Sequence, residues 1–170
     1  DSQTIGMGDS AAKDMHLSSA ELQRMTTGDG LQVGGSSGGN IIVNNVTAGG
    51  SQFLVPVVSI VAAGDDASVT FESNPSTFGG VAAQADNGVF VNVQFNSKVA
   101  QVYLDGDMDD SAVGDSSNVI RFIDGGAINA ILMMTLEASA GSIEPVGLLT
   151  LSAGTGLVTH DNLLGANMGR

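Results

Sequence analysis

The residues best suited to chemistry are five aspartates crowded into one short stretch of the chain. Asp105, Asp107, Asp109 and Asp110 lie almost side by side, and Asp115 follows shortly after them. Carboxylates at alternating positions of a flexible loop can converge on a hard cation, and Ca²⁺ takes about six to eight oxygen ligands. These five residues are therefore the candidate ligands of a weak calcium site, while a solvated acidic loop is the simpler interpretation.

Known calcium-binding motifs do not fit this stretch. In an EF-hand loop beginning at Asp105, Asp110 would occupy the position of the sharp-turn glycine and Ser116 that of the bidentate glutamate. The glycine-rich nonapeptide of calcium-binding β-rolls is also absent. A shorter acidic pair, Asp65 and Asp66, is interpreted as an ordinary turn. Ca²⁺ is thus the one cofactor that the sequence suggests, and that prediction rests on the aspartates alone.

The histidines and basic residues give no catalytic constellation. His16 and His160 are far apart, and neither has a second His or a Cys at ligand spacing. His16 alternates with Met15 and Leu17, so we expect it to face outward from a strand. Arg121 could assist a polysaccharide lyase, which needs cationic help for developing charge. The simpler interpretation is that Arg121 pairs with an acidic neighbour on the solvent face, and we predict no catalytic residue.

Composition limits the functions open to the chain. Its 170 residues suffice for one domain, and residues 1–170 are treated as such. Eighteen acidic residues against five basic ones give a net charge of −13, which would repel a phosphate backbone. No stretch approaches the roughly 20 apolar residues of a membrane helix. Nucleic-acid binding and membrane insertion are therefore not expected, and the absence of cysteine removes disulfides and thiolate metal sites.

Two similar sequence segments indicate the fold that positions the candidate residues. Segments 135–143 (TLEASAGSI) and 150–158 (TLSAGTGLV) each contain a short apolar strand, a turn of small residues and a second strand; segment 30–43 is a looser copy. A chain that repeats strand and turn at short intervals typically builds a solenoid. We predict an all-β, right-handed parallel β-helix. An antiparallel β-sandwich remains the alternative, because regular turns and alternation suit both folds.

Short strands are expected where β-branched runs are bounded by Gly, Asn or Asp. The clearest is segment 89–95, in which Val89, Val91, Val93 and Phe95 would share one face. Ser18, followed three residues later by a glutamate, predicts a capping box and one or two helical turns. The other expected strands are residues 31–33, 41–46, 55–62, 67–71, 99–104, 119–122, 131–138, 147–153 and 156–159. The asparagines at 44, 45, 87, 96 and 118 are expected in left-handed turns or in ladders.

Several short segments resemble the repeat units of giant β-strand-rich surface proteins. They are segments 19–25 (SAELQRM), 39–48 (GNIIVNNVTA), 85–89 (ADNGV) and 148–154 (LLTLSAG). In these segments the chain is similar to filamentous-haemagglutinin-type adhesins, whose repeats form long right-handed parallel β-helices. The resemblance covers most of the chain and carries no catalytic motif. It implies extracellular display, adhesion or filament formation.

The sequence therefore predicts a non-enzymatic structural repeat of a large extracellular or cell-surface protein. It would extend a filament or adhesin stalk by stacking coil on coil, with copies of itself or adjacent repeats as head-to-tail partners. Because the chain begins at Asp1 without an initiator Met, we expect one repeat unit or a fragment of a larger chain. The first alternative is a calcium-dependent adhesive or glycan-binding module, with a surface glycan or receptor as partner. The second is a polysaccharide lyase-like enzyme.

Overall fold

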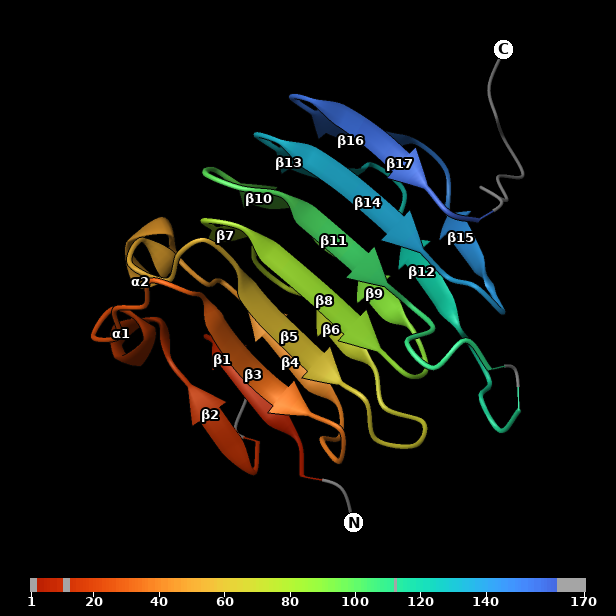
Figure 1. Cartoon of the computed structure of the whole chain (residues 1–170), viewed down its shortest axis with the longest axis horizontal. Coiled ribbons are helices and arrows are strands. Elements are labelled where there is room, and N and C mark those ends of the chain that lie inside the picture. The colour runs from red at the N-terminus through yellow and green to blue at the C-terminus, as the bar shows by residue number, and fades with distance from the viewer. Residues whose placement is uncertain (1–2, 11–12, 112, 162–170) are drawn as a thin grey trace.

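The computed structural model describes residues 3–10, 13–111 and 113–161, and over these residues the chain winds into a parallel β-helix (Figure 1). Three parallel sheets run along the axis, and successive strands pass from one sheet to the next, except that the first two, Ile5–Gly8 and Met15–Leu17, pair with each other in one sheet. In Figure 1 the front strands run left to right while the coils rise from the N-terminal to the C-terminal end, so the helix is right-handed. The predicted fold class is confirmed, and the antiparallel sandwich is excluded.

The largest sheet has seven strands in the order β15-β12-β9-β6-β4-β1-β2. Its strands are β1 (Ile5–Gly8), β2 (Met15–Leu17), β4 (Ile41–Asn44), β6 (Val69–Phe71), β9 (Val89–Val91), β12 (Val119–Phe122) and β15 (Ser142–Pro145). The six-stranded sheet, in the order β17-β14-β11-β8-β5-β3, faces the viewer in Figure 1. Its strands are β3 (Leu31–Gly35), β5 (Val58–Ala62), β8 (Val81–Ala85), β11 (Val102–Asp105), β14 (Met133–Glu137) and β17 (Gly156–Thr159).

The third side of the β-helix changes character along the axis. It is a four-stranded sheet, in the order β16-β13-β10-β7, and two short helices continue it toward the N-terminal end. Its elements are α1 (Ser19–Leu22), α2 (Ala48–Ser51), β7 (Ser76–Phe78), β10 (Phe95–Ser97), β13 (Gly126–Ala130) and β16 (Leu149–Ala153). Helix α1 contacts α2, and α2 contacts β7, so each element stacks on the next (Figure 1). Within the described ranges, no helix is both long and apolar enough to cross a membrane.

Helix α1 begins where the sequence predicts. The Ser18 N–H donates to Glu21 Oε2 (2.9 Å), and the Glu21 N–H donates to Ser18 Oγ (3.3 Å), so both halves of the capping box are present. Leu22 on the inner face is fully buried. The second helical turn, α2, was not predicted. Thr47 caps it by accepting the Gly50 N–H (3.0 Å), although its sequence is rich in glycine.

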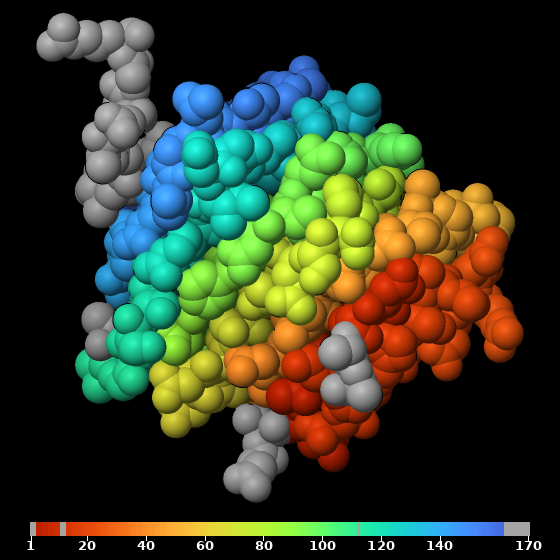
Figure 2. Space-filling view, turned by 180° about the vertical axis from the view of Figure 1, so that it is seen from behind, coloured from red at the N-terminus to blue at the C-terminus, as the bar shows by residue number. Residues whose placement is uncertain are grey.

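Similar residues stack on one another in the interior, as the solenoid prediction requires. Ile41, Val69, Val89, Ile120 and Ile143 lie in register on neighbouring strands, and all five are buried. β-Branched side chains pack well against such cross-strand neighbours. The coils appear as successive bands from the N-terminal to the C-terminal end in the space-filling view (Figure 2). Each band therefore buries its apolar face against the bands on either side of it.

The similar sequence segments do not, however, coincide with the stacked positions. Thr135 in β14 pairs with Val158 of β17, whereas Thr150 in β16 pairs with Ala127 of β13. Thr135 and Thr150 thus lie in different sheets, and the structural repeat is not the repeat seen in the sequence. Segment 89–95 also differs from the prediction, because it divides into β9 and the start of β10 in two sheets. Alternation persists through this corner, since Val89, Val91 and Phe95 are all buried. Strands β1, β7, β8, β13 and β15 were not predicted.

Asn45, Asn96 and Asn118 behave as predicted, whereas Asn44 and Asn87 have no left-handed φ and bond to loop residues instead. Asn45 and Asn118 have left-handed φ angles of 52° and 44°. Asn96 and Asn129 pair in register on β10 and β13, and the Asn129 Nδ2 donates to Asn96 Oδ1 (2.9 Å). Asn87 spans two turns: its Nδ2 donates to Asp66 (3.0 Å) and its Oδ1 accepts the Ser117 N–H (2.7 Å). Asparagine therefore fixes the corners of the coils.

Candidate functional site

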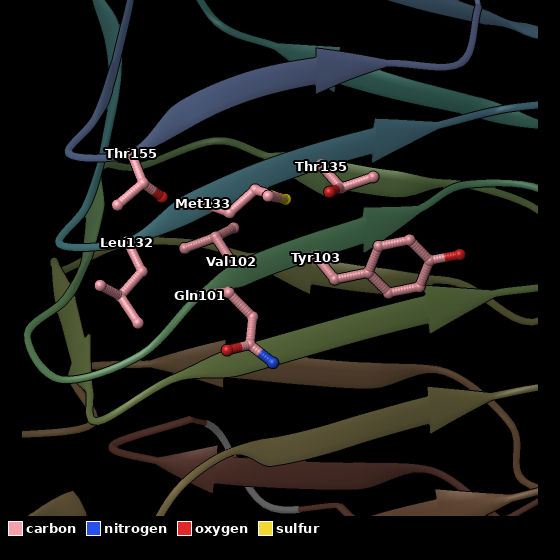
Figure 3. Close-up of a pocket in the computed structure, with 7 residues that line it drawn as sticks. All are labelled: Gln101, Val102, Tyr103, Leu132, Met133, Thr135 and Thr155. Atoms are coloured by element: carbon pink, nitrogen blue, oxygen red, sulfur yellow. The ribbon is translucent and has the colours of Figure 1, made fainter.

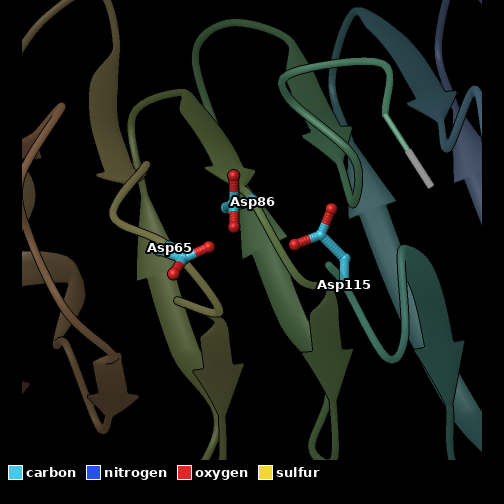
Figure 4. Close-up of side chains that lie close together, drawn as sticks. All are labelled: Asp65, Asp86 and Asp115. Carbon is cyan, nitrogen blue, oxygen red and sulfur yellow. The ribbon is translucent and has the colours of Figure 1, made fainter. Parts of the chain in front are cut away.

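Three aspartates from successive coils meet at the corner between the six-stranded and seven-stranded sheets (Figure 4). Asp65 follows β5, Asp86 follows β8, and Asp115 lies in the loop between β11 and β12. Each offers one carboxylate oxygen, and these oxygens lie within 4.8 Å of one another. A cluster of carboxylates of this kind can hold a hard divalent cation.

The acidic corner carries unneutralised like charge. Burial, and then the charge of the neighbouring Asp115, raises the pKa of Asp86 above the ordinary carboxyl range, although its carboxylate accepts the Asp66 N–H (2.9 Å). The Oδ2 atom of Asp115 is buried and has no hydrogen-bond partner. Two carboxylates that share a site disfavour each other's charged forms. A proton or a cation bound at this corner would therefore relieve the repulsion.

The five predicted calcium ligands are not brought together into one site. Asp115 joins the acidic corner with Asp65, which the sequence analysis interpreted as part of an ordinary turn, and with Asp86. The signal that could have found this cluster is positional, since Asp65 and Asp86 both follow strands of one sheet. Strands of a β-helix end at the same corner, so their trailing residues stack. That inference needs the register between coils, which the sequence does not supply.

Asp105 faces the outer side of the coil and bonds to its neighbours. It accepts the Tyr103 hydroxyl (3.1 Å) and, at its other oxygen, the Asp107 N–H (3.2 Å), while Gln84 lies 3.5 Å away. The Tyr103 hydroxyl also lies 2.8 Å from Glu137 Oε2. Burial and the two carboxylates raise the pKa of Tyr103, so its proton stays in place and can be donated to one carboxylate at a time. Asp105 is thus occupied in fixing the tyrosine ring.

Asp107, Asp109 and Asp110 remain in the loop after β11. Asp107 is buried, which raises its pKa, and one of its oxygens accepts the Ala140 N–H. Asp109 is exposed and accepts the Ser111 N–H (3.0 Å). Asp110 is exposed and adopts a left-handed φ of 56°. The loop therefore places one carboxylate inside and two outside.

A shallow groove of about 540 Å³ lies beside Tyr103 on the outer face of the six-stranded sheet (Figure 3). Its walls include Gln101, Tyr103, Leu132, Met133, Thr135 and Thr155. The adjacent methionines divide between two environments: Met134 is fully buried in the core, whereas Met133 is 46% exposed in the groove. Strand alternation separates the two side chains. The groove is predominantly apolar and lacks a cationic side chain among these residues.

The last described coil leaves part of its interior uncovered. Leu149 and Leu151 of β16 and Leu157 of β17 are in register with inward-facing positions of the preceding coil. Their partners Gly126, Ile128 and Met134 are buried, yet Leu149 and Leu151 are half-buried and Leu157 is 46% exposed. At the N-terminal end Leu22 of α1 is fully buried, but Met15 of β2, in register with the buried Ile5, is 41% exposed. Both ends of the described β-helix therefore leave some inward-facing side chains partly uncovered.

The remaining predicted residues lie on the surface. Arg121 pairs with Glu144 (2.8 Å) on the adjacent coil and lies over the Phe90 ring at 5.8 Å, so the predicted acidic neighbour is found. His16 is exposed on β2, as expected, with Nε2 2.9 Å from the Gly8 carbonyl oxygen. His160 is exposed after β17.

The chain is therefore a parallel β-helix in which aspartates from three successive coils form an acidic corner. Comparison with known proteins found no matching family model, no matching curated protein and no matching solved structure.

The acidic corner predicts an unusual dependence of stability on pH. A carboxyl group whose pKa is higher in the folded state binds more protons when folded, so stability rises as pH falls through the folded pKa and levels off below the unfolded pKa. Asp86, Asp105 and Asp107 all have raised pKa values. With a chelator present, we expect the melting temperature to be higher near pH 5 than at pH 7. Asp86→Asn should raise the pH 7 value and shrink this difference, whereas Asp29→Asn on the exposed surface should change neither.

Proposed function

We propose that this chain is a non-enzymatic structural segment of an extracellular or cell-surface protein, which lengthens a stalk or filament by stacking further parallel coils on its C-terminal end. The observation that carries this proposal is the partial exposure of Leu149, Leu151 and Leu157, which face inward in the last described coil. Apolar side chains in register with a fully buried column gain burial when another coil covers them.

Backbone groups that point away from the preceding coil at the same end support stacking. The Gly154 N–H donates to the Ala130 carbonyl (3.0 Å), and the His160 N–H donates to the Leu136 carbonyl (2.9 Å). Because backbone groups of a parallel strand alternate between its two neighbours, the adjacent residues Ala153 and Thr159 direct theirs away from the preceding coil. Edges of this kind are templates for further strands.

One strand at this end is less suited to pairing. The Val146 N–H donates to the Phe122 carbonyl (2.9 Å), which places Pro145 of β15 at the alternate position facing the open edge. Proline has no N–H to donate and is tolerated at such edges. We infer that a stacked coil gains most of its backbone bonds from β16 and β17.

The N-terminal end offers a partial match to the C-terminal end. Strands β3 and β2 are the outermost strands of the six-stranded and seven-stranded sheets, while α1 occupies the third side. A second copy stacked head to tail would thus meet strands on two sides and a helical turn on the third. Such a heterologous contact builds an open filament rather than a closed ring.

The absence of a catalytic role is also part of the proposal. Arg121, the residue that we considered for lyase chemistry, is paired with Glu144 on the solvent face. The acidic net charge of −13 is poorly suited to an anionic polysaccharide. The resemblance to surface adhesins points in the same direction and supports an extracellular location.

Association through the last coil is tested by placing a charge on its inner face. Leu151→Asp should abolish concentration-dependent association of the purified chain, measured by sedimentation velocity and by negative-stain electron microscopy, because a stacked coil would bury the carboxylate. Leu148→Asp is the matched control, since Leu148 is 80% exposed in the turn before β16. A wild-type chain that stays monomeric at high concentration, or two variants that associate equally, would contradict the proposal.

A further inference from the structure

Among its described residues, the loop between β11 and β12 holds three buried side-chain oxygens without a hydrogen-bond partner: Oδ2 of Asp115, at the acidic corner, and the Oδ1 atoms of Asp107 and Asn118. Asp107 is 1% exposed and Asn118 is 4% exposed, and the Oδ1 atom of each is unpartnered. Most buried polar groups in folded proteins are bonded, so an unsatisfied pair in one loop calls for a physical explanation. Both atoms are hydrogen-bond acceptors when Asp107 is ionised.

The unpartnered oxygen of Asn118 does not result from a reversed amide. Asn118 Nδ2 donates to the Ser111 carbonyl oxygen (2.5 Å), and turning the amide would place two oxygens against each other. Asp107 is anchored through its other oxygen, which accepts the Ala140 N–H. Burial raises the pKa of Asp107, while the backbone N–H groups of Ala140 and Ser111 act in the opposite direction.

The side chains of Asp107 and Asn118 are held in the same part of the loop. Asn118 bonds to the carbonyl of Ser111, and Asp109 Oδ1 accepts the N–H of that same residue (3.0 Å). The turn at 140–141 packs on both, because the Ala140 N–H bonds Asp107, and a Cβ added at Gly141 would lie 3.0 Å from Asn118 Cβ. The loop thus gathers oxygen acceptors around Ser111, with no basic side chain among these bonded groups.

We propose that the β11–β12 loop binds a hard divalent cation, of the Ca²⁺ type, through the unpartnered Oδ1 atoms of Asp107 and Asn118 together with the carboxylate of Asp109. Carboxylate, amide and backbone oxygens are the ligands that Ca²⁺ takes, and its irregular coordination suits a loop better than the octahedral geometry of Mg²⁺. None of these three ligands belongs to the acidic corner, although Asp109 lies close enough to raise the pKa of Asp86. The proposal does not depend on end-to-end stacking. It retains two of the five aspartates predicted from the sequence and adds Asn118, which was not predicted as a ligand.

The chain supplies its own reporter for the test. Tyr103 is the single tyrosine and there is no tryptophan, so Tb³⁺ emission sensitised by the protein at the tyrosine band must come through Tyr103. The Tyr103 hydroxyl bonds to Asp105, which accepts the Asp107 N–H (3.2 Å), so the proposed site lies two hydrogen bonds away. We expect wild-type protein to sensitise Tb³⁺, with Ca²⁺ displacing it more effectively than Mg²⁺, and we expect Ca²⁺ to raise the melting temperature.

Variants separate this site from the acidic corner. Asp107→Asn should lose sensitised emission and the Ca²⁺-dependent rise in melting temperature, yet melt at or above wild type in a chelator, because a buried uncompensated charge has been removed. Asn118→Gly should also lose the response while tolerating the left-handed φ of 44°. Asp65→Asn, the matched control in the acidic corner, should respond like wild type.

Two outcomes would overturn the proposal. Loss of the response in Asp65→Asn with retention in Asp107→Asn would move the cation to the acidic corner. A wild-type chain with neither Tb³⁺ emission nor a calcium-dependent melting temperature would show that the loop binds no cation. The chelator measurement keeps a folding defect apart from a binding defect, since a misfolded variant melts below wild type in both conditions.

Discussion

Replacing Phe95 by alanine is expected to lower the free energy of unfolding by about 3–5 kcal/mol. Phe95 is fully buried, and its ring stacks on that of Phe71 with centroids 4.5 Å apart and planes at 21°. The two rings come from β10 and β6, which belong to different sheets, so the pair crosses the interior of the β-helix. Truncation would remove this contact and leave a cavity that the flanking coils cannot readily fill, because each coil is held by backbone bonds on both sides.

Urea-induced unfolding followed by circular dichroism measures this loss directly. The matched control is Phe53→Ala, since Phe53 is 48% exposed and its removal should cost less than about 1 kcal/mol. Two equal losses would mean that the Phe71–Phe95 stack does not contribute to the core. A lower dependence of the free energy of unfolding on urea concentration, with the midpoint unchanged, would instead show that the coils no longer unfold together.

The importance of these rings was not predicted from composition. Only 4% of the residues are aromatic, a composition that by itself favours a narrow interior filled by Val, Ile, Leu, Ala and Met. Yet Phe71, Phe78, Phe95 and Phe122 are all among the largest fully buried side chains. Composition gives an average over the chain, whereas inward alternation concentrates a few phenylalanines in the core. The position of Phe95 on the inward face was predictable, and its contact with Phe71 was not.

Local features were predicted better than long-range ones. The capping box of Ser18 and the strands β12 and β17 follow from neighbouring residues, and each lies where the sequence predicts it. The pairing of coils depends on loops of unequal length, such as the long one between β11 and β12, and no local pattern reports that register. For this reason the similar segments indicated the correct fold class although they do not stack on each other.

The candidate sites show the same limit. The aspartates of the β11–β12 loop were found from their spacing, but spacing cannot show that Asp105 bonds Tyr103 while Asp115 turns toward Asp86. Asn118 was expected to occupy a left-handed turn, which it does, and its unpartnered oxygen becomes visible only with the packing of Gly141 against it. In a β-helix, stacking of the coils brings together side chains that are far apart in the sequence. Residue spacing alone therefore identifies candidate residues but not the sites that they form.

Gly34→Ala tests the close contact between the first coils and is expected to cost about 2–5 kcal/mol, from backbone strain and overpacking together. Gly34 in β3 has a φ of 87°, which L-residues rarely adopt. A Cβ at this position would overlap the carbonyl oxygen of Val61, its register partner on β5, and would lie 2.8 Å from Ile41 Cδ1. Neither group can move freely, because Val61 lies in the ladder and Ile41 is fully buried.

The same substitution at Gly28 separates this contact from the general effect of removing a glycine. A Cβ at Gly28 meets nothing within 4 Å, so Gly28→Ala should be neutral or stabilise the chain by up to about 1 kcal/mol through the unfolded state. Thermal and urea unfolding of the two variants give the comparison. If Gly34→Ala is as stable as Gly28→Ala, β3 cannot lie against β5 in the observed register. The first coil, which contains α1 and β3, would then pack against β5 in another way. Only the C-terminal coils would retain the stacking on which the proposed function depends.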